Sequence, residues 1–169
     1  MCYTVGMYEI FSSVVSGMYQ IGTSLGVGAS TVAITLWLVA LSDGAISKEE
    51  GRLLHAVYTI LRVAMVLIGV ALLLSHLGQT VVRDLQYALQ WAFFGVLCMN
   101  AVMMTCHKMP MRFGPAIQAG TWYALFLITV IPVARLPEIV VAVIYLAWLV
   151  VVYLVIRGIL NHIHDRTGN

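Results

Sequence analysis

Long apolar stretches separated by short polar breaks divide the chain into five segments. A helix that crosses a bilayer needs about 20 mostly apolar residues. The stretches that meet this requirement run from Ile21 to Leu41, about Leu53 to Leu74, about Ala88 to Cys106, about Ala116 to Ala134, and Ile139 to Ile156. The pattern predicts an all-α integral membrane protein, built as a bundle of about five transmembrane helices.

The breaks contain residues that favour turns and helix starts. Ser42, Asp43 and Gly44 form a turn-like run, and the segment Ser47 to Glu50 reads as a capping box that opens the second helix. Pro137 precedes Glu138, which is a favourable start for the last helix. We therefore expect short loops between the five helices.

The first twenty residues are harder to assign. The stretch from Tyr8 to Gln20 carries Glu9 and several serines, which makes it too polar for a confident span. It can extend the first helix beyond the bilayer, lie in the interface, or re-enter the membrane as a sixth short helix. We favour an extension or an interfacial segment over 1–20.

Composition narrows the class of protein. Of the 169 residues, 62% are hydrophobic and 9% are charged. Soluble domains carry about 25% charged residues, so this balance excludes an ordinary water-soluble domain. The net charge of +2 is spread along the chain, and we expect no nucleic-acid partner. The expected environment of the single domain, residues 1–169, is the lipid bilayer.

The distribution of Lys and Arg predicts the orientation. One set of loops and ends holds six of these cations, namely Lys48, Arg52, Lys108, Arg112, Arg157 and Arg166, whereas the opposite set holds Arg83 and Arg135. Cytoplasmic loops carry the excess of positive charge. We expect a protein of a prokaryotic inner or plasma membrane, with an outside N-terminus and a cytoplasmic tail over 158–169.

Polar residues recur on one face of several predicted helices. The second helix has His55, Arg62, Gly69 and His76 on one sevenfold series. The third has Gln86, Gln90, Asn100 and His107 on a similar seam, and the fourth has Gln118, Thr121 and Thr129. Because polar groups are costly against hydrocarbon, we expect these faces to converge inside a bundle of the first four helices. The fifth helix then packs outside.

The first helix is rich in small residues. Gly22 and Gly26 form a GxxxG motif, which Ser30 extends by another turn. Such grooves let two helix backbones approach closely. The groove indicates either a tightly packed central helix, a water path, or a homo-oligomer joined at Gly22 and Gly26. Residues 24–28 also resemble a potassium-channel filter, but that filter needs an extended backbone, whereas this stretch is predicted to be helical.

Arg62 is the only charged residue well inside a predicted span. Such residues are expensive in a membrane and usually have a functional or structural reason. One interpretation makes Arg62 an anion site flanked by Tyr58, Thr59 and Asn100. The other makes it a structural clamp that donates to carbonyls and hydroxyls of the first helix.

These features favour a small channel or transporter for a small polar or anionic solute, with its path between the first four helices. The residues that we expect to line this path are Gln20, Thr23, Ser30, Tyr58, Arg62, Gln90, Asn100 and Gln118.

Two other classes of protein stay open. His55, Cys106 and His107 map to the cytoplasmic side and offer ligands for a transition metal or one haem in a redox subunit, although no ligand motif fixes their spacing. A non-catalytic assembly or immunity-type protein is the other alternative. The sequence requires no cofactor, and the absence of the GxSxG, HExxH, CxxC and phosphate-loop motifs favours a protein that is not an enzyme.

Overall fold

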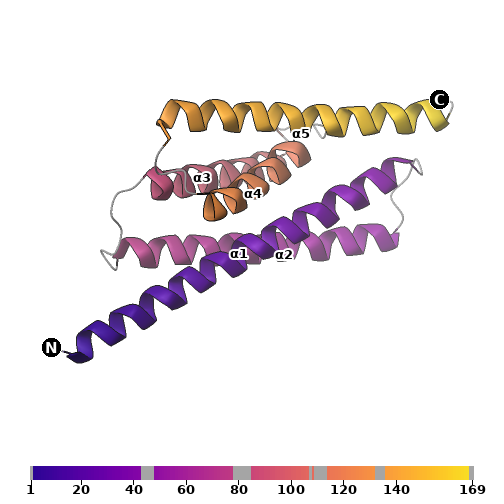
Figure 1. Ribbon diagram of the computed structural model, residues 1–169. Coiled ribbons are helices and arrows are strands. Elements are labelled where there is room, and N and C mark those ends of the chain that lie inside the picture. The colour runs from indigo at the N-terminus through magenta and orange to yellow at the C-terminus, as the bar shows by residue number, and fades with distance from the viewer. Residues whose placement is uncertain are drawn as a thin grey trace.

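The computed structural model describes residues 2–42, 48–77, 85–106, 108, 114–131 and 136–167. Within these ranges the chain forms five helices, and successive helices run in opposite directions (Figure 1). They are α1 (Cys2–Ser42), α2 (Lys48–Leu77), α3 (Leu85–Thr105), α4 (Gly114–Val130) and α5 (Glu138–Thr167). The all-helical fold agrees with the sequence prediction.

Four of these helices are long and apolar enough to cross a membrane. The apolar stretches that qualify are Glu9–Val39 in α1, Lys48–Leu77 in α2, Leu85–Thr105 in α3 and Glu138–Ile159 in α5. They coincide with four of the five predicted spans. The chain is therefore a helical bundle with four candidate membrane-spanning helices.

The fourth predicted span, from Ala116 to Ala134, is longer than the helix found there. Helix α4 has 17 residues and ends at Val130, which makes it about 25 Å long, against about 30 Å of hydrocarbon in a bilayer. Pro132 lies just beyond this end. A proline disfavours helical backbone in the residue before it and lacks an N–H, so the helix cannot continue through this point.

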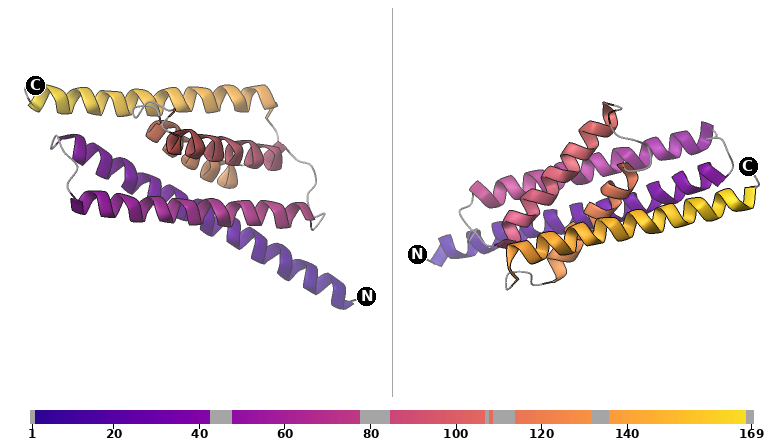
Figure 2. Two further views of the ribbon diagram at one scale, coloured as in Figure 1. Left: turned by 180° about the vertical axis from the view of Figure 1, so that it is seen from behind. Right: turned by 90° about the horizontal axis from the view of Figure 1, so that it is seen from above.

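Helix α1 has 41 residues and no break, so it is about 60 Å long. Its N-terminal part projects beyond the end of α2 in two views (Figures 1 and 2). Met7 and Ile10 on this part are 71% and 67% exposed. The segment 2–20 therefore has the geometry of an extension of the first helix, and residues 2–42 contain no separate short helix.

The helices form three levels, with α5 on one side, α3 and α4 in the middle, and α1 crossing α2 on the other side (Figures 1 and 2). Helix α4 contacts α1, α3 and α5, and it supplies Trp122 and Leu125, both with no exposed surface. Ile68 of α2 and Leu97 of α3 are equally buried. The core of the bundle thus lies between α1, α2, α3 and α4.

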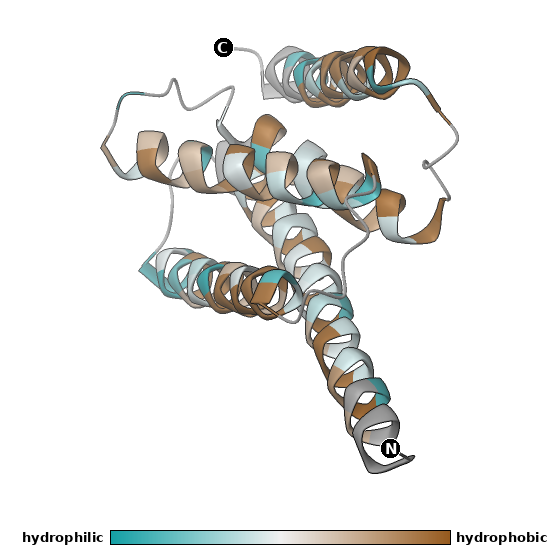
Figure 3. Cartoon of the chain, turned by 90° about the vertical axis from the view of Figure 1, so that its left-hand side faces the viewer, coloured by the Kyte–Doolittle hydropathy of each residue, from teal (hydrophilic) through white to brown (hydrophobic). Residues whose placement is uncertain are grey.

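Helix α5 packs on α4, as expected for an outer helix. The Trp148 Nε1 donates to the carbonyl of Gly120 over 3.0 Å, and the hydroxyls of Tyr145 and Thr121 are 2.8 Å apart. The remaining faces of α5 expose apolar side chains such as Ile139 and Leu146, and apolar residues cover most of this helix in Figure 3. Hydrogen bonds to α4 therefore fix one face, and the rest is compatible with lipid.

The small-residue groove of α1 is filled within the chain. A Cβ added at Gly22 would lie 2.8 Å from the Ile68 side chain of α2, and one added at Gly26 would lie within van der Waals distance of the Trp122 ring of α4. The central-helix interpretation therefore accounts for both glycines, and the groove is not open for a second copy to occupy. The homo-oligomer itself stays a prediction. Residues 24–28 are helical, which excludes the filter resemblance.

Candidate functional site

The helices α2, α3 and α4 line a half-open hollow of about 290 Å³ beside Arg62, which we call the arginine hollow. Its lining residues are Tyr58, Leu61, Arg62, Met65, Ala101, Met104, Thr105 and Gln118. None of these residues is acidic, so the arginine charge has no counter-charge in the wall.

Arg62 lies at the middle of α2, and its side chain is exposed. Among the residues that the structure describes, none accepts a hydrogen bond from Arg62 or forms an ion pair with it. The hollow is also lined by α2, α3 and α4 alone, without α1. The structural-clamp interpretation, which needs acceptors on α1, is therefore wrong for the described residues, and the guanidinium is available to an anion.

Gln118 is held in the wall by Asn100, which is 3% exposed. The Asn100 Nδ2 donates to the Gln118 Oε1 over 2.7 Å and to the carbonyl of Gly114 over 3.2 Å. Because a backbone carbonyl only accepts, the Asn100 atom beside Gly114 must be the amide nitrogen, and Gln118 must then present its oxygen to it. The Gln118 Nε2 is left as a donor, and no described residue accepts its N–H groups.

Donors therefore dominate the polar part of the arginine hollow. Arg62 and the Gln118 amide nitrogen contribute N–H groups, and Tyr58 contributes a hydroxyl. The Thr105 hydroxyl already donates to the carbonyl of Ala101 over 2.8 Å. A cation with unused neutral donors beside it is suited to bind a negatively charged group.

A small pocket of about 20 Å³ adjoins this hollow and extends it toward α1. It shares Tyr58, Leu61, Met104 and Gln118 with the arginine hollow and adds Ser30 from α1. The Ser30 hydroxyl donates to the carbonyl of Val27 over 3.0 Å, so its oxygen can take part in a further hydrogen bond only as an acceptor. All four helices of the predicted path therefore reach this region.

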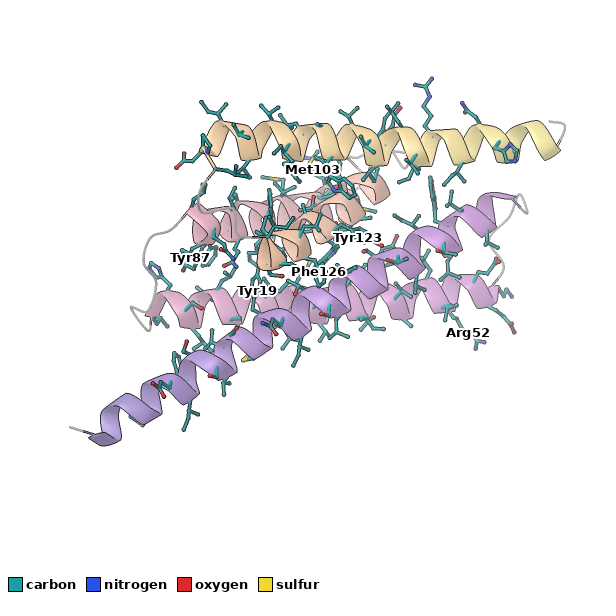
Figure 4. The ribbon with its side chains drawn as sticks, viewed as in Figure 1. Tyr19, Arg52, Tyr87, Met103, Tyr123 and Phe126 are labelled. Atoms are coloured by element: carbon teal, nitrogen blue, oxygen red, sulfur yellow. The ribbon has the colours of Figure 1, made fainter. Side chains whose placement is uncertain are left out.

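A second polar hollow, of about 190 Å³, lies toward the opposite end of the bundle, and we call it the serine hollow. Its lining residues are Phe11, Ser12, Val15, Ser16, Tyr19, Leu72, Ser75 and Gln90. In Figure 4, Arg52 lies at one end of α2, and Tyr19, which lines the serine hollow, lies between the two ends of that helix. Along α2, Ser75 lies about 20 Å from Arg62.

The arginine hollow and the serine hollow share no lining residue. Ile68, Leu97, Trp122 and Leu125 have no exposed surface, and the Trp122 ring packs directly against the backbone at Gly26. Among these four residues, the Trp122 Nε1 is a buried donor without a hydrogen-bond partner. The two hollows are therefore separate pockets, and the helices that line them also supply these buried core residues.

The predicted path residues divide into four groups. Ser30, Tyr58, Arg62 and Gln118 gather at the arginine hollow and its side pocket, Gln90 lines the serine hollow, and Asn100 fixes Gln118. Gln20 and Thr23 line neither hollow. Gln20 is exposed, and Thr23 is buried with its hydroxyl 3.1 Å from the carbonyl of Tyr19 in its own helix.

The expected convergence of polar faces is confirmed for α3 and α4 and wrong for part of α2. Asn100 meets Gln118, and the Gln86 Nε2 donates to the carbonyl of Ile128 over 3.0 Å. By contrast, His55 and His76 are exposed. Arg62, on the same series, is exposed as well, although it lines the arginine hollow.

Sequence reasoning missed some wall residues. Met65, Ala101, Met104 and Thr105 line the arginine hollow, and their spacing by three and four residues from Arg62 or from one another places them on shared helical faces. Ser12 and Ser16, one turn apart on α1, line the serine hollow. The spacing of Ser12, Ser16 and Tyr19 places all three on one face of the helix, and this pattern in the sequence indicates a shared polar face.

The described residues do not form a cluster of metal ligands that would support the metal alternative. No group of three His, Cys, Asp or Glu side chains gathers there. His55 and Cys106 are exposed, and the third predicted ligand, His107, lies outside the described residues. The metal or haem site therefore stays a prediction.

Comparisons with known proteins assign no family. No family model, no curated protein and no solved structure matches the chain. The functional argument therefore depends on the geometry of the hollows.

Proposed function

We propose that this protein is a small membrane channel or transporter that passes a small polar or anionic solute between α1, α2, α3 and α4. The arginine hollow is the binding point of this path, and the serine hollow is its opening at the other end. Arg62 contacts the solute.

The observation that supports this proposal is that Arg62 lines a hollow without a described partner for its charge. An arginine at the middle of a membrane helix is costly, and such residues usually face a partner, a cavity or a water-filled path. Arg62 lines a hollow of about 290 Å³ and has no partner among the residues described in the structure. An anion that enters the hollow supplies the missing partner.

In this proposal the conformation is an occluded one, because the two hollows share no lining residue. Passage requires that Trp122 leave its position against Gly26, or that α1 and α4 separate at this contact. Gated paths commonly close through an apolar constriction of this kind. The proposal therefore predicts slow or gated transport rather than an open pore.

A swelling assay tests the proposal. Purified protein is placed in liposomes with valinomycin, which supplies potassium permeability, and swelling is followed after dilution into isosmotic potassium chloride, nitrate or methanesulfonate. We expect faster swelling than in protein-free liposomes for at least one anion, because anion entry then limits the rate. Rates equal to those of protein-free liposomes for all three anions, and for glycerol and urea, would contradict the proposal.

A further inference from the structure

We infer that the arginine hollow binds a small monoanion that carries a short aliphatic chain. This inference deepens the proposed function and rests on its assignment of Arg62 as the anion contact. Three features of the wall support it: the number of charges, the division of polar and apolar side chains, and the size of the hollow.

The charge count favours a monoanion. Arg62 is the single formal charge in the wall, and the other polar groups, Tyr58, Thr105 and Gln118, are neutral. One guanidinium offers a planar pair of N–H donors to one carboxylate-like or sulfonate-like group. A second negative charge would have no partner in the hollow, and an unpaired charge away from water is strongly disfavoured.

The apolar half of the wall favours an aliphatic chain beside that charge. Leu61, Met65, Ala101 and Met104 line the same hollow as Arg62. A bare halide would leave these side chains facing water, whereas an alkyl chain covers them. Methionine side chains are unbranched and adaptable, so they fit chains of slightly different length.

The size of the hollow limits the chain. Its volume of about 290 Å³ lies just below the range of about 300–1,000 Å³ that is usual for small-molecule sites. A chain of three to five carbons fits beside the anionic group. Two sources share this chemistry: a free organic anion, and an anionic lipid whose chain enters from the bilayer.

Thermal stability in lipid nanodiscs distinguishes these cases. The full chain is placed in nanodiscs of phosphatidylcholine, and its melting temperature is measured by tryptophan fluorescence against chloride, methanesulfonate, butanesulfonate and ethane-1,2-disulfonate. Sulfonates stay ionised, so no neutral acid complicates the result. A ligand that binds the folded state alone raises the melting temperature with concentration, which gives its dissociation constant.

We expect butanesulfonate to bind at least tenfold more tightly than methanesulfonate, because each buried CH₂ is worth about fourfold in affinity. The disulfonate and chloride are expected to bind weakly. R62Q should abolish the butanesulfonate effect, M65Q should reduce the difference between the two monosulfonates, and the control R52Q should retain both. Arg52 is exposed and is not part of the wall.

Each other outcome has a definite meaning. Equal affinity for chloride and butanesulfonate, or retention of the butanesulfonate effect in R62Q, overturns the inference. The proposed transport function is then tested by the swelling assay alone. Added phosphatidylglycerol can also raise the melting temperature. If R62Q abolishes this effect, and if butanesulfonate then gives no further stabilisation, the result supports the inferred chemistry with lipid as the source. Swelling rates at the protein-free level would then contradict the proposed function alone.

Discussion

The Asn100 side-chain nitrogen of α3 lies 2.7 Å from the Gln118 Oε1 of α4, and this contact decides which end of the Gln118 amide remains for the arginine hollow. The nearby carbonyl of Gly114 fixes the direction of the bond, because it accepts from the same nitrogen. A buried residue outside the wall thus controls the chemistry of a residue in the wall.

Replacing Asn100 by Leu should destabilise the protein and disorder the wall together. The Gly114 carbonyl and the Gln118 oxygen would lose their donor, and a buried polar group left without a partner costs about 1–3 kcal/mol. We expect a lower melting temperature in detergent and weaker anion binding per folded molecule. An N100L variant with the melting temperature and the anion affinity of the wild type would show that Asn100 does not hold Gln118.

Gly26 and Gly28 of α1 form a matched pair for testing the contact with Trp122. A Cβ at Gly26 meets the Trp122 ring, whereas a Cβ at Gly28 has no atom within 4 Å. G26A should lose about 1–3 kcal/mol through overpacking, and G28A should gain about 0.5–1 kcal/mol because alanine favours the helix. Melting curves of both variants check this, and equal stabilities would argue against a tight contact between α1 and α4.

Trp122 should also limit passage. It has no exposed surface, its ring packs against Gly26, and it lines neither hollow. W122A removes this ring, so swelling per folded molecule should increase, although the cavity costs about 3–5 kcal/mol of stability. The comparison is made on the folded fraction alone. An unchanged or lower rate per folded molecule would place the barrier elsewhere.

The orientation predicted from the charges gives a separate test. The exposed cations Lys48 and Arg52 lie in the first turns of α2, Lys108 follows the end of α3, and Arg157 lies two residues before the end of the candidate span of α5. Single-cysteine variants at Lys108 and Arg157, in a background with the native cysteines replaced, should react with an impermeant thiol reagent only from the cytoplasmic side. Reaction from the outer side would reverse the assignment.

The sequence was sufficient to predict five helices, because apolar length and turn residues indicate where they lie, but it did not predict that α1 begins as early as Cys2. It overestimated α4 because the apolar stretch continues past Val130, whereas Pro132 prevents the helix from doing so. Periodicity identified Arg62, Asn100 and Gln118 as polar positions on their helices. It could not state which helix each face meets, so the contact of Asn100 with Gln118 and the packing of Trp122 on Gly26 required three-dimensional packing.

The most direct test of the central claim compares R62Q with R52Q in the swelling assay, with both rates divided by the amount of folded protein. Both changes remove one positive charge from α2, but Arg62 alone lines the hollow. Our account predicts that R62Q loses anion-dependent swelling while remaining folded, and that R52Q keeps the wild-type rate. A folded R62Q variant with the wild-type rate and the wild-type preference among anions would contradict it.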